Sequence, residues 1–445
     1  MVDLAAIREN VEAVLPSVTD DLIRLVAIPS ISAQPEHASD MQRVADEIVG
    51  HLDALNCDRV KVVDSAGQPA IIAHFDADPA KPTVCLYAHM DVQPTGDPAE
   101  WTSAPFAAQR RGDRLFGRGT ADDKAGVAAH LAALRAFDGK PPVNVIVLIE
   151  GEEEMGSPTL GRILAENADD LAADLYIVAD CGNWAIGQPA FTTSLRGVVD
   201  CVVEVRTLSH AIHSGEFGGV VPDALTTLCR LLASLHDGDG NVAVEGLVSS
   251  EDTSVEQREE VVRSDSAVLD SVQLIGSGPI AARTWLKPSI SIIGLDTTPI
   301  ATSSNTLIPA AKARISLRVA PGDTGAHALE CLRRHLEAKI EWGARLTIID
   351  GEAAEPCRTP LSADLEEKAN WAWHQAFGVD PMQIGTGGTI GMIAEFQNTF
   401  PQAGVLATAV SDPDCRMHGI DESLYLPDWE AVCLAEALLL ARLAE

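Results

Sequence analysis

The chain has 445 residues, more than one ordinary hydrophobic core needs and enough for two domains. Its 65 acidic and 32 basic side chains leave a net charge of −33, a field that repels phosphate backbones and anionic membrane surfaces. We therefore expect neither nucleic acid nor a membrane as a partner, and the nine scattered cysteines, without a Cys-x-x-Cys pair, favour a reducing cytoplasm.

The first predicted element is an amphipathic helix at Met1–Val18, which lacks the basic-then-apolar order of a secretory signal. No segment has the roughly 18 uninterrupted apolar residues of a membrane span. Continuous apolar runs typical of buried parallel strands then follow at Val84–Tyr87, Val143–Ile149 and Leu175–Val178. Helical patterns follow two of these runs, the longer one at Lys124–Phe137. This alternation predicts an α/β domain whose mostly parallel sheet is flanked by helices.

The pattern changes near Arg196. Alternating apolar and polar residues at Val198–Val205 predict a half-exposed strand, and Ser289–Ile293 and Ala313–Val319 also have strand character. A helical pattern at Pro222–Leu235 and a polar, acidic stretch at 237–278 lie among them. We therefore expect an inserted α+β domain at 196–318. The α/β pattern resumes with helices at Ala326–Ile340 and Asp364–Phe377, so residues 1–195 and 319–445 are expected to form the other domain.

Several predicted strands are followed directly by side chains that can bind a metal ion. Together with two similar residues elsewhere, these candidates are His89, Asp122, Glu153, Glu154, Asp180 and His418. Open α/β sheets place their sites at the carboxyl ends of strands, so most of the candidates are expected at one edge of the sheet. Two imidazoles and several carboxylates suit zinc or another borderline divalent ion. The set predicts metal-assisted hydrolysis.

Local spacing suggests a role for some of these residues. His89 and Asp91 are two apart, so in an extended segment both side chains point the same way and the carboxylate can orient the imidazole. Taken alone, a His-x-Asp pair is more typical of an exposed surface than of a metal site. Three adjacent carboxylates at 152–154 repel one another unless a cation is present. Neighbours on an extended chain point in opposite directions, so one of them can bind metal while the next acts as a general base.

Asp122 follows a glycine-containing turn and opens a predicted helix, where its carboxylate could bridge two ions. The alternative is that Asp122 and Asp123 are helix N-terminal residues stabilised by the helix dipole. The segment Gly385–Thr389 has no lysine after its glycines, which argues against a phosphate loop. It better suits backbone donors for a carboxylate.

Taken together, these motifs resemble the dinuclear-zinc metallopeptidases that include glutamate carboxypeptidases, aminoacylases, succinyl-diaminopimelate desuccinylases and carnosine-type dipeptidases. The resemblance implies that His89 and Asp180 bind one ion, that Glu154 and His418 bind the other, and that Asp122 bridges them. It implies that Asp91 orients the first histidine, that Glu153 is the general base, and that the Asp122–Asp123 peptide bond is cis.

The same resemblance assigns the inserted region to a lid and dimerisation domain. His213 corresponds to a histidine that reaches the partner subunit's site and helps to hold the oxyanion. Asn305 and Arg318 correspond to residues that hold the carboxylate of the substrate. Gly388 and Thr389 belong to the glycine-rich loop and are expected to bind substrate. A residue before this loop is often charged in the family, whereas this chain has Thr386 and Gly387 there.

We therefore expect a cytoplasmic, homodimeric dipeptidase that uses two divalent ions per chain, zinc or alternatively manganese or cobalt, on free dipeptides. An N-acyl or N-carbamoyl amino-acid amidohydrolase would share the same catalytic motifs. A non-catalytic metal- or ligand-binding protein with this fold is the alternative of another class. It should lack a ligand or the base, whereas this sequence contains them all.

Overall fold

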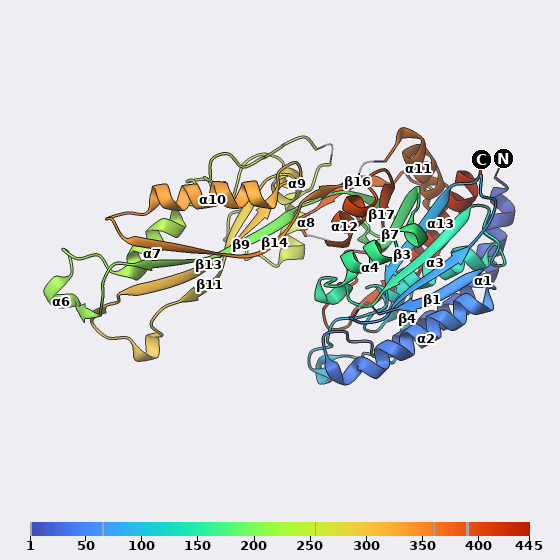
Figure 1. The fold of residues 1–445 in the computed structure, drawn as a ribbon, viewed down its shortest axis with the longest axis horizontal. Coiled ribbons are helices and arrows are strands. Elements are labelled where there is room, and N and C mark those ends of the chain that lie inside the picture. The colour runs from blue at the N-terminus through green and yellow to red at the C-terminus, as the bar shows by residue number, and fades with distance from the viewer. Residues whose placement is uncertain (1, 65, 254, 360, 389–390) are drawn as a thin grey trace. The chain divides into compact units, whose positions relative to one another are not determined.

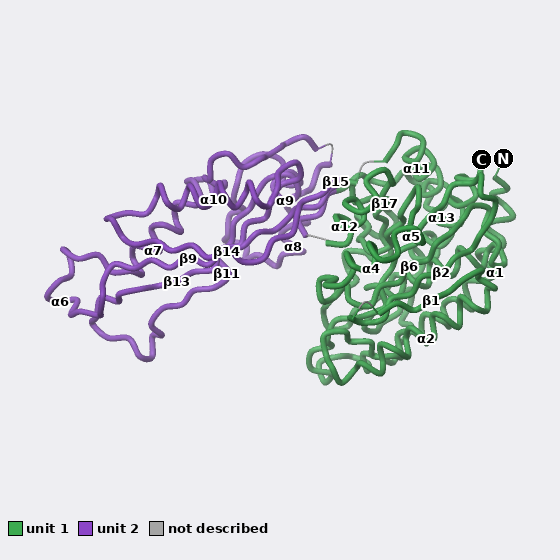
Figure 2. The backbone as a smooth tube through the Cα atoms, viewed as in Figure 1, with its two compact units in different colours: residues 1–193, 359–384, 391–445 green, residues 194–358, 385–390 purple. Residues whose placement is uncertain are grey.

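The computed structural model describes residues 2–64, 66–253, 255–359, 361–388 and 391–445. The chain divides into two compact units, one of residues 1–193, 359–384 and 391–445 and the other of residues 194–358 and 385–390, coloured separately in Figure 2. Among the described residues, no helix combines the length and the apolar character needed to cross a bilayer.

The first unit contains most of the main sheet, whose strand order is β1-β2-β6-β3-β7-β17-β8-β15, where β15 is Cys357–Arg358 (Figure 1). Its strands are β1 (Arg59–Val63), β2 (Ala70–Phe75), β3 (Thr83–His89), β6 (Asn144–Glu150), β7 (Leu175–Gly182), β8 (Ala190–Leu195) and β17 (Gly404–Ser411), with β16 (Met382–Thr386) beside β8. The four central strands β6, β3, β7 and β17 run parallel, whereas β1, β2 and β8 pair antiparallel at the edges. The predicted α/β class with a mostly parallel sheet is confirmed.

Helices and short elements surround this sheet. They are α1 (Leu4–Val26), α2 (Ala38–Ala54), α3 (Lys124–Arg135), α4 (Leu160–Glu166), α5 (Ala168–Leu171), α11 (Ala363–Phe377), α12 (Gly391–Thr399), α13 (Leu426–Leu443) and the 3₁₀ turns η1 (Pro35–His37), η2 (Pro98–Glu100) and η3 (Glu153–Met155). A small sheet of β4 (Gln109–Arg111), β5 (Arg114–Phe116) and β18 (Ser423–Tyr425) lies outside the main one.

Alternate residues of the central strands bury their side chains on opposite faces, which places helices on both sides. Leu86 and Ile177 join the core formed with α1, α3 and α13. Their neighbours Tyr87 and Tyr176 instead contact Phe396 of α12. Both faces are therefore apolar, which is why these strands are continuous hydrophobic runs in the sequence.

The second unit contains an antiparallel sheet of order β11-β13-β9-β14. Its elements are β9 (Gly197–Arg206), β10 (Ile212–His213), β11 (Ser289–Asp296), β12 (Thr306–Leu307), β13 (Ala310–Val319), β14 (Arg345–Ala354), β15 (Cys357–Arg358), α6 (Ser214–Phe217), α7 (Ala224–Ala233), α8 (Glu259–Ser266), α9 (Ile280–Trp285), η4 (Ile300–Thr302) and α10 (Gly325–Lys339). Both α7 and α10 pack on this sheet. Val199, Val203 and Leu332 are in their shared core.

This unit continues to residue 358, past the boundary expected at 318. The physical reason is strand pairing, because β14 pairs with β9 along most of its length and α10 packs on both strands. The helix expected at Ala326–Ile340 exists as α10, but it covers the antiparallel sheet and not the parallel one. The functional roles of the two units, catalytic domain and lid, stay a prediction.

Candidate metal centre

The ends of three neighbouring strands bring candidate ligands to one edge of the parallel sheet. His89 is the last residue of β3, Glu153 and Glu154 lie in η3 just after β6, and Asp180 lies near the end of β7. Strand β3 pairs with both β6 and β7, so the three ends are adjacent. Parallel pairing thus gathers residues that are far apart in sequence.

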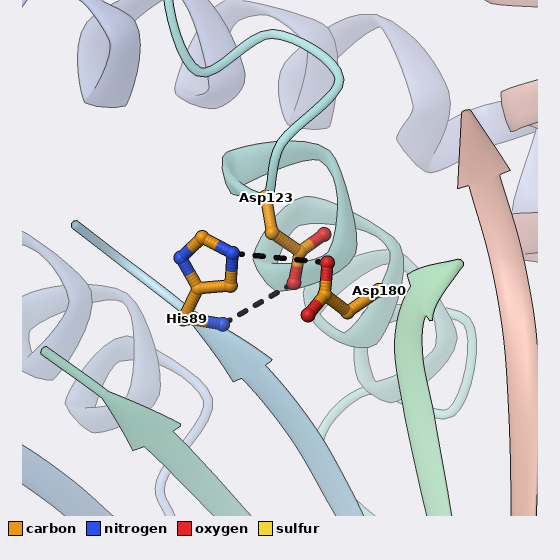
Figure 3. Close-up of side chains that lie close together, drawn as sticks. All are labelled: His89, Asp123 and Asp180. Carbon is orange, nitrogen blue, oxygen red and sulfur yellow. Dashed lines mark hydrogen bonds and ion pairs between the residues drawn. The ribbon is translucent and has the colours of Figure 1, made fainter. Parts of the chain in front are cut away.

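One group of side chains forms around His89, which is buried. Its Nε2 atom lies 3.0 Å from Asp122 Oδ1 and 3.7 Å from Asp180 Oδ1. Figure 3 shows the imidazole of His89 directed toward the Asp180 carboxylate, with Asp123 beside them. His89, Asp123 and Asp180 each offer a ligand atom within 4.8 Å of the others.

A second group forms around His418, which comes from the loop before β18. Its Nε2 atom lies 2.9 Å from Asp122 Oδ2 and 3.2 Å from Glu154 Oε2. Asp122 therefore directs one carboxylate oxygen toward His89 and the other toward His418. Asp122, Glu154 and His418 form the second set of three possible ligands.

These separations suit metal ions at both groups. Ligand atoms that lie about 2.0–2.2 Å from one tetrahedral zinc ion are about 3.3–3.6 Å apart. The distances from His89 to Asp180 and from His418 to Glu154, 3.7 and 3.2 Å, fall close to this range. Imidazole nitrogens with carboxylate oxygens are also the donors that zinc, manganese and cobalt accept in proteins. The residues present therefore fit two divalent ions.

Asp122 and Asp123 are adjacent but differ in what their carboxylates contact. The peptide bond between them is cis, in agreement with the expectation from the resemblance. Asp123 Oδ1 accepts a hydrogen bond from the Gly126 N–H at 3.1 Å and so caps helix α3, while its Oδ2 accepts one from the His89 N–H at 3.2 Å. The helix-cap alternative thus describes Asp123, and Asp122 is free to lie between the two histidines.

The carboxylates at this edge raise one another's proton affinity. Burial, together with Asp180, raises the pKa of Glu153 to about 9, and burial also raises the pKa of Asp180 to about 6. Hydrogen bonds to Asp122 and Glu154 raise the pKa of His418 to about 10. So many acidic groups in a buried space favour protons or cations, and divalent ions would stabilise the ionised carboxylates.

Asp91 connects both groups. Its Oδ1 lies 3.3 Å from His89 Nδ1, and its Oδ2 accepts hydrogen bonds from Ser32 Oγ at 2.6 Å and from the Glu154 N–H at 3.1 Å. The Glu154 carboxylate is held in turn by Gln93, whose Nε2 donates to Oε2 at 2.8 Å. His89 Nδ1 also lies 3.1 Å from the backbone carbonyl of Asp91, so this residue can fix the ring orientation of His89.

The remaining predicted site residues lie in the second unit. His213 and Asn305 are exposed and close together, because β10 pairs with β12 and the Ser214 N–H donates to the Asn305 carbonyl at 3.0 Å. Arg318 is half-buried near the far end of β13, about 26 Å along the strand from its start at a rise of about 3.3 Å per residue. The Gly388 N–H donates to Thr386 Oγ1, and Thr389 lies outside the described residues.

Sequence reasoning did not identify Glu422, a buried residue in the loop after His418. Its carboxylate accepts hydrogen bonds from three backbone N–H groups of the turn before α3, including that of Asp122, and pairs with Arg118. No local signal marks it, since a glutamate in a polar loop normally faces solvent.

Comparison with known proteins supplies the context for this geometry. Residues 85–444 match the peptidase family M20/M25/M40. The chain is 33% identical to a cysteinylglycine-S-conjugate dipeptidase of Corynebacterium striatum, over 94% of this chain and 93% of that protein. It is 30% identical to the human Beta-Ala-His dipeptidase, over 86% of this chain and 81% of that protein.

Solved structures of similar fold cover nearly the whole chain. Human carnosine dipeptidase 1 matches with a TM-score of 0.79 and 25% identity, covering 100% of this chain and 99% of that one. The yeast di-peptidase Dug1p matches with a TM-score of 0.79 and 23% identity, covering 99% and 98%. At that identity the Dug1p comparison concerns the fold alone.

Proposed function

The chain belongs to peptidase family M20/M25/M40, and from this membership we propose that it is a dipeptidase that hydrolyses free dipeptides with two divalent ions. The predicted metallopeptidase class is confirmed by the family. The curated relatives named above are dipeptidases that match over most of their length, which supports a dipeptide substrate. A purely ligand-binding role is disfavoured because the candidate ligands and the candidate base are all present.

The observation that carries the proposal is the position of Asp122. Its two oxygens lie 3.0 Å from His89 Nε2 and 2.9 Å from His418 Nε2. This is the arrangement expected of a carboxylate that bridges two ions. We assign His89 and Asp180 to one ion and Glu154 and His418 to the other, with zinc as the expected metal and manganese or cobalt as alternatives.

When bound, the ions would polarise the scissile carbonyl and lower the pKa of a nearby water. Glu153 is the proposed general base, because it adjoins both groups and its Oε2 lies 4.0 Å from His89 Nε2. Its carboxylate accepts a proton from the attacking water and then donates it to the leaving amine. Asp91 would hold the His89 ring in the orientation that directs Nε2 to the site, because its backbone carbonyl lies 3.1 Å and its carboxylate Oδ1 3.3 Å from His89 Nδ1.

Residues of the second unit are proposed to bind substrate. Asn305 and Arg318 would hold the carboxylate of the dipeptide, and Gly388 and Thr389 would also bind substrate. His213 is proposed to act in the site of the partner subunit of a homodimer, where it would donate to the developing oxyanion. Its exposed position beside Asn305 supports such a role. The scattered cysteines, which form no Cys-x-x-Cys pair in the sequence, support the proposed cytoplasmic location.

Metal dependence is the first test. Prolonged chelation should abolish dipeptide hydrolysis, and Zn²⁺, Mn²⁺ or Co²⁺ added separately should restore it, because the proposed ligands have no catalytic function without an ion. The measurement is hydrolysis rate together with metal content per chain. Undiminished activity in protein that retains no metal would refute the two-metal mechanism.

The substrate class is tested with a panel of free dipeptides, N-acetyl amino acids and N-carbamoyl amino acids. Each compound is assayed at equal concentration with the protein to which metal has been restored. Dipeptides should have the highest kcat/KM. Hydrolysis restricted to the acetyl or carbamoyl compounds would contradict the dipeptidase proposal while leaving the metal centre intact.

A further inference from the structure

A single buried carboxylate joins two loops that supply ligands to the proposed metal centre. The side chain of Glu422 is fully buried. Its Oε1 accepts hydrogen bonds from the N–H groups of Gly119 at 3.0 Å, Ala121 at 2.9 Å and Asp122 at 3.2 Å. Its Oε2 lies 2.5 Å from Arg118 Nη1. The donors compensate the cost of burying the charge.

The amides that donate to Glu422 belong to one short turn that leads into Asp122. Fixing the N–H of Asp122 and of the residue before it restricts where the Asp122 carboxylate can lie. The Glu422 carbonyl also accepts a hydrogen bond from the Gly117 N–H at 2.9 Å, so the start of the turn is held by the same residue. The turn is therefore fixed at both ends from outside its own sequence.

Glu422 itself belongs to the second loop, which also contains His418 four residues earlier. The loop is anchored at a second point, where Asp421 accepts hydrogen bonds from the N–H and the hydroxyl of Thr102 at 2.9 and 2.6 Å. Asp122 and His418 lie almost 300 residues apart in sequence, yet their facing atoms are 2.9 Å apart. Glu422 directly links the backbones that present them.

We propose that Glu422 is a positioning residue that sets the separation of Asp122 and His418, and thereby the affinity for the ion that they share with Glu154. The inference rests on the proposed metal ligands. Glu422 is not one of the proposed metal ligands, and it acts through the two ligand loops. Hydrogen-bonded residues behind metal ligands typically contribute about 10–100-fold to metal affinity.

The first experiment measures metal binding to the full-length protein, with Zn²⁺ titrated against a competing chelator and with the visible absorption of bound Co²⁺. Glu422→Gln keeps the size of the side chain but places an amide among N–H donors. We expect the affinity for one of the two ions to fall about 10–100-fold. The Co²⁺ spectrum of that ion should change, and the ion assigned to His89 and Asp180 should be affected less.

Glu436→Gln is the matched control. Glu436 is also fully buried and pairs with a basic side chain, since its Oε1 lies 2.9 Å from His130 Nδ1, but it holds no ligand loop. This variant should be destabilised without a change in metal affinity or in the Co²⁺ spectrum. Equal losses of metal affinity in both variants would show that Glu422 contributes only general stability, and would overturn the proposal.

Removing the Glu422 carboxylate alone leaves the buried Arg118 guanidinium without a countercharge, which can prevent folding. The double variant Glu422→Gln/Arg118→Met removes both buried charges and should show the same loss of metal affinity. Wild-type affinity for both ions in this variant would overturn the proposal.

A second measurement needs no substitution. Hydrogen exchange of wild-type protein should be slow at the amides of Gly119, Ala121 and Asp122 after the metal is removed, because the Glu422 carboxylate accepts these bonds. Rapid exchange that slows only when metal is added would mean that the ion orders the turn, and would refute the positioning role. Failure of the wild-type protein to bind two ions would instead refute the proposed metal centre.

Discussion

Two adjacent aspartates show how sharply neighbouring residues can differ in the groups that their carboxylates contact. The Asp123 carboxylate accepts one hydrogen bond from a backbone N–H in the first turn of α3 and another from the His89 N–H, so each of its oxygens has an N–H donor. Asp122 directs its oxygens to His89 and His418. Although burial raises the proton affinity of Asp122, hydrogen bonds from His418 and His89 hold its pKa below the ordinary value. Burial and the neighbouring Asp180 raise the pKa of Asp123 instead.

Substitution of the two adjacent glutamates should separate base from ligand. Glu153→Gln should lower kcat by about 10²–10⁴-fold or more, because the proton acceptor is lost, while metal content stays near that of the wild type. Glu154→Gln should reduce metal occupancy, because Glu154 Oε2 lies 3.2 Å from His418 Nε2 in the second ligand group. Steady-state kinetics and metal analysis of both variants test this.

The two glutamine variants control for each other, since each removes one charge from the same 3₁₀ turn. Reversed phenotypes, with metal lost in Glu153→Gln and retained in Glu154→Gln, would exchange the two roles.

Among the elements, helices α3 and α13 are joined by a buried pair under the parallel sheet. His130 Nδ1 lies 2.9 Å from Glu436 Oε1, and His130 Nε2 lies 2.9 Å from the Tyr87 carbonyl. Both ring nitrogens thus face acceptors, an arrangement that suits the protonated imidazole. Burial alone would lower the pKa of His130, but the Glu436 carboxylate outweighs it and raises the pKa.

This pair predicts a pH-dependent contribution to stability. A histidine whose pKa is raised on folding contributes fully below the unfolded value of about 6.5, and the contribution is lost as the pH rises through the folded pKa. His130→Gln should therefore destabilise by about 3–5 kcal/mol at pH 6 and by less at pH 9. Urea unfolding of metal-free wild type and variant at both pH values tests this.

His74 provides a comparison, because its pKa is shifted in the opposite direction from that of His130. Burial, with the nearby Arg59, lowers its pKa, so the folded state disfavours the proton that the unfolded state binds. His74→Gln should accordingly cost less stability at pH 6 than at pH 9. If both variants showed the same pH trend, the linkage assigned to His130 would be wrong.

At the scale of the whole molecule, the chain separates its proposed functions between two units. The metal-binding candidates all lie in the first unit, at the ends of parallel strands and in two loops. His213, Asn305 and Arg318 lie in the second unit. If His213 serves the partner's site, each active site needs two chains, and the homodimer is the functional form.

Mixed dimers test that arrangement. His213→Ala and Glu153→Ala chains should each be inactive alone. In a mixed dimer, one of the two sites combines an intact Glu153 with an intact His213 from the partner, so about half of the wild-type activity per mixed dimer should return. Activity is measured after subunit exchange, with exchange followed by differently tagged chains.

As controls, each variant is taken through the same exchange procedure alone, and each should remain inactive. Proven exchange without recovery of activity would place His213 in its own subunit's site or outside the reaction.

The sequence by itself determined the features that depend on short segments. Apolar runs of four to seven residues marked the central strands, because a strand buried on both faces must be hydrophobic throughout. Candidate ligands directly after those runs, such as His89 and Asp180, were identifiable because parallel strands end at a common edge. The order of the motifs along the chain indicated the peptidase family, which the comparisons confirm.

Only the tertiary structure decided features that depend on distant pairing. Whether Asp122 faces a second histidine depends on where His418 lies, and that loop comes almost 300 residues later. Glu422 could not be identified from the sequence as a buried residue, because the N–H groups that donate hydrogen bonds to its carboxylate are equally remote in sequence. The helix α10 has an ordinary amphipathic pattern, which shows that one face is buried but not against which sheet. Local periodicity encodes an element, whereas its partners are chosen by long-range packing.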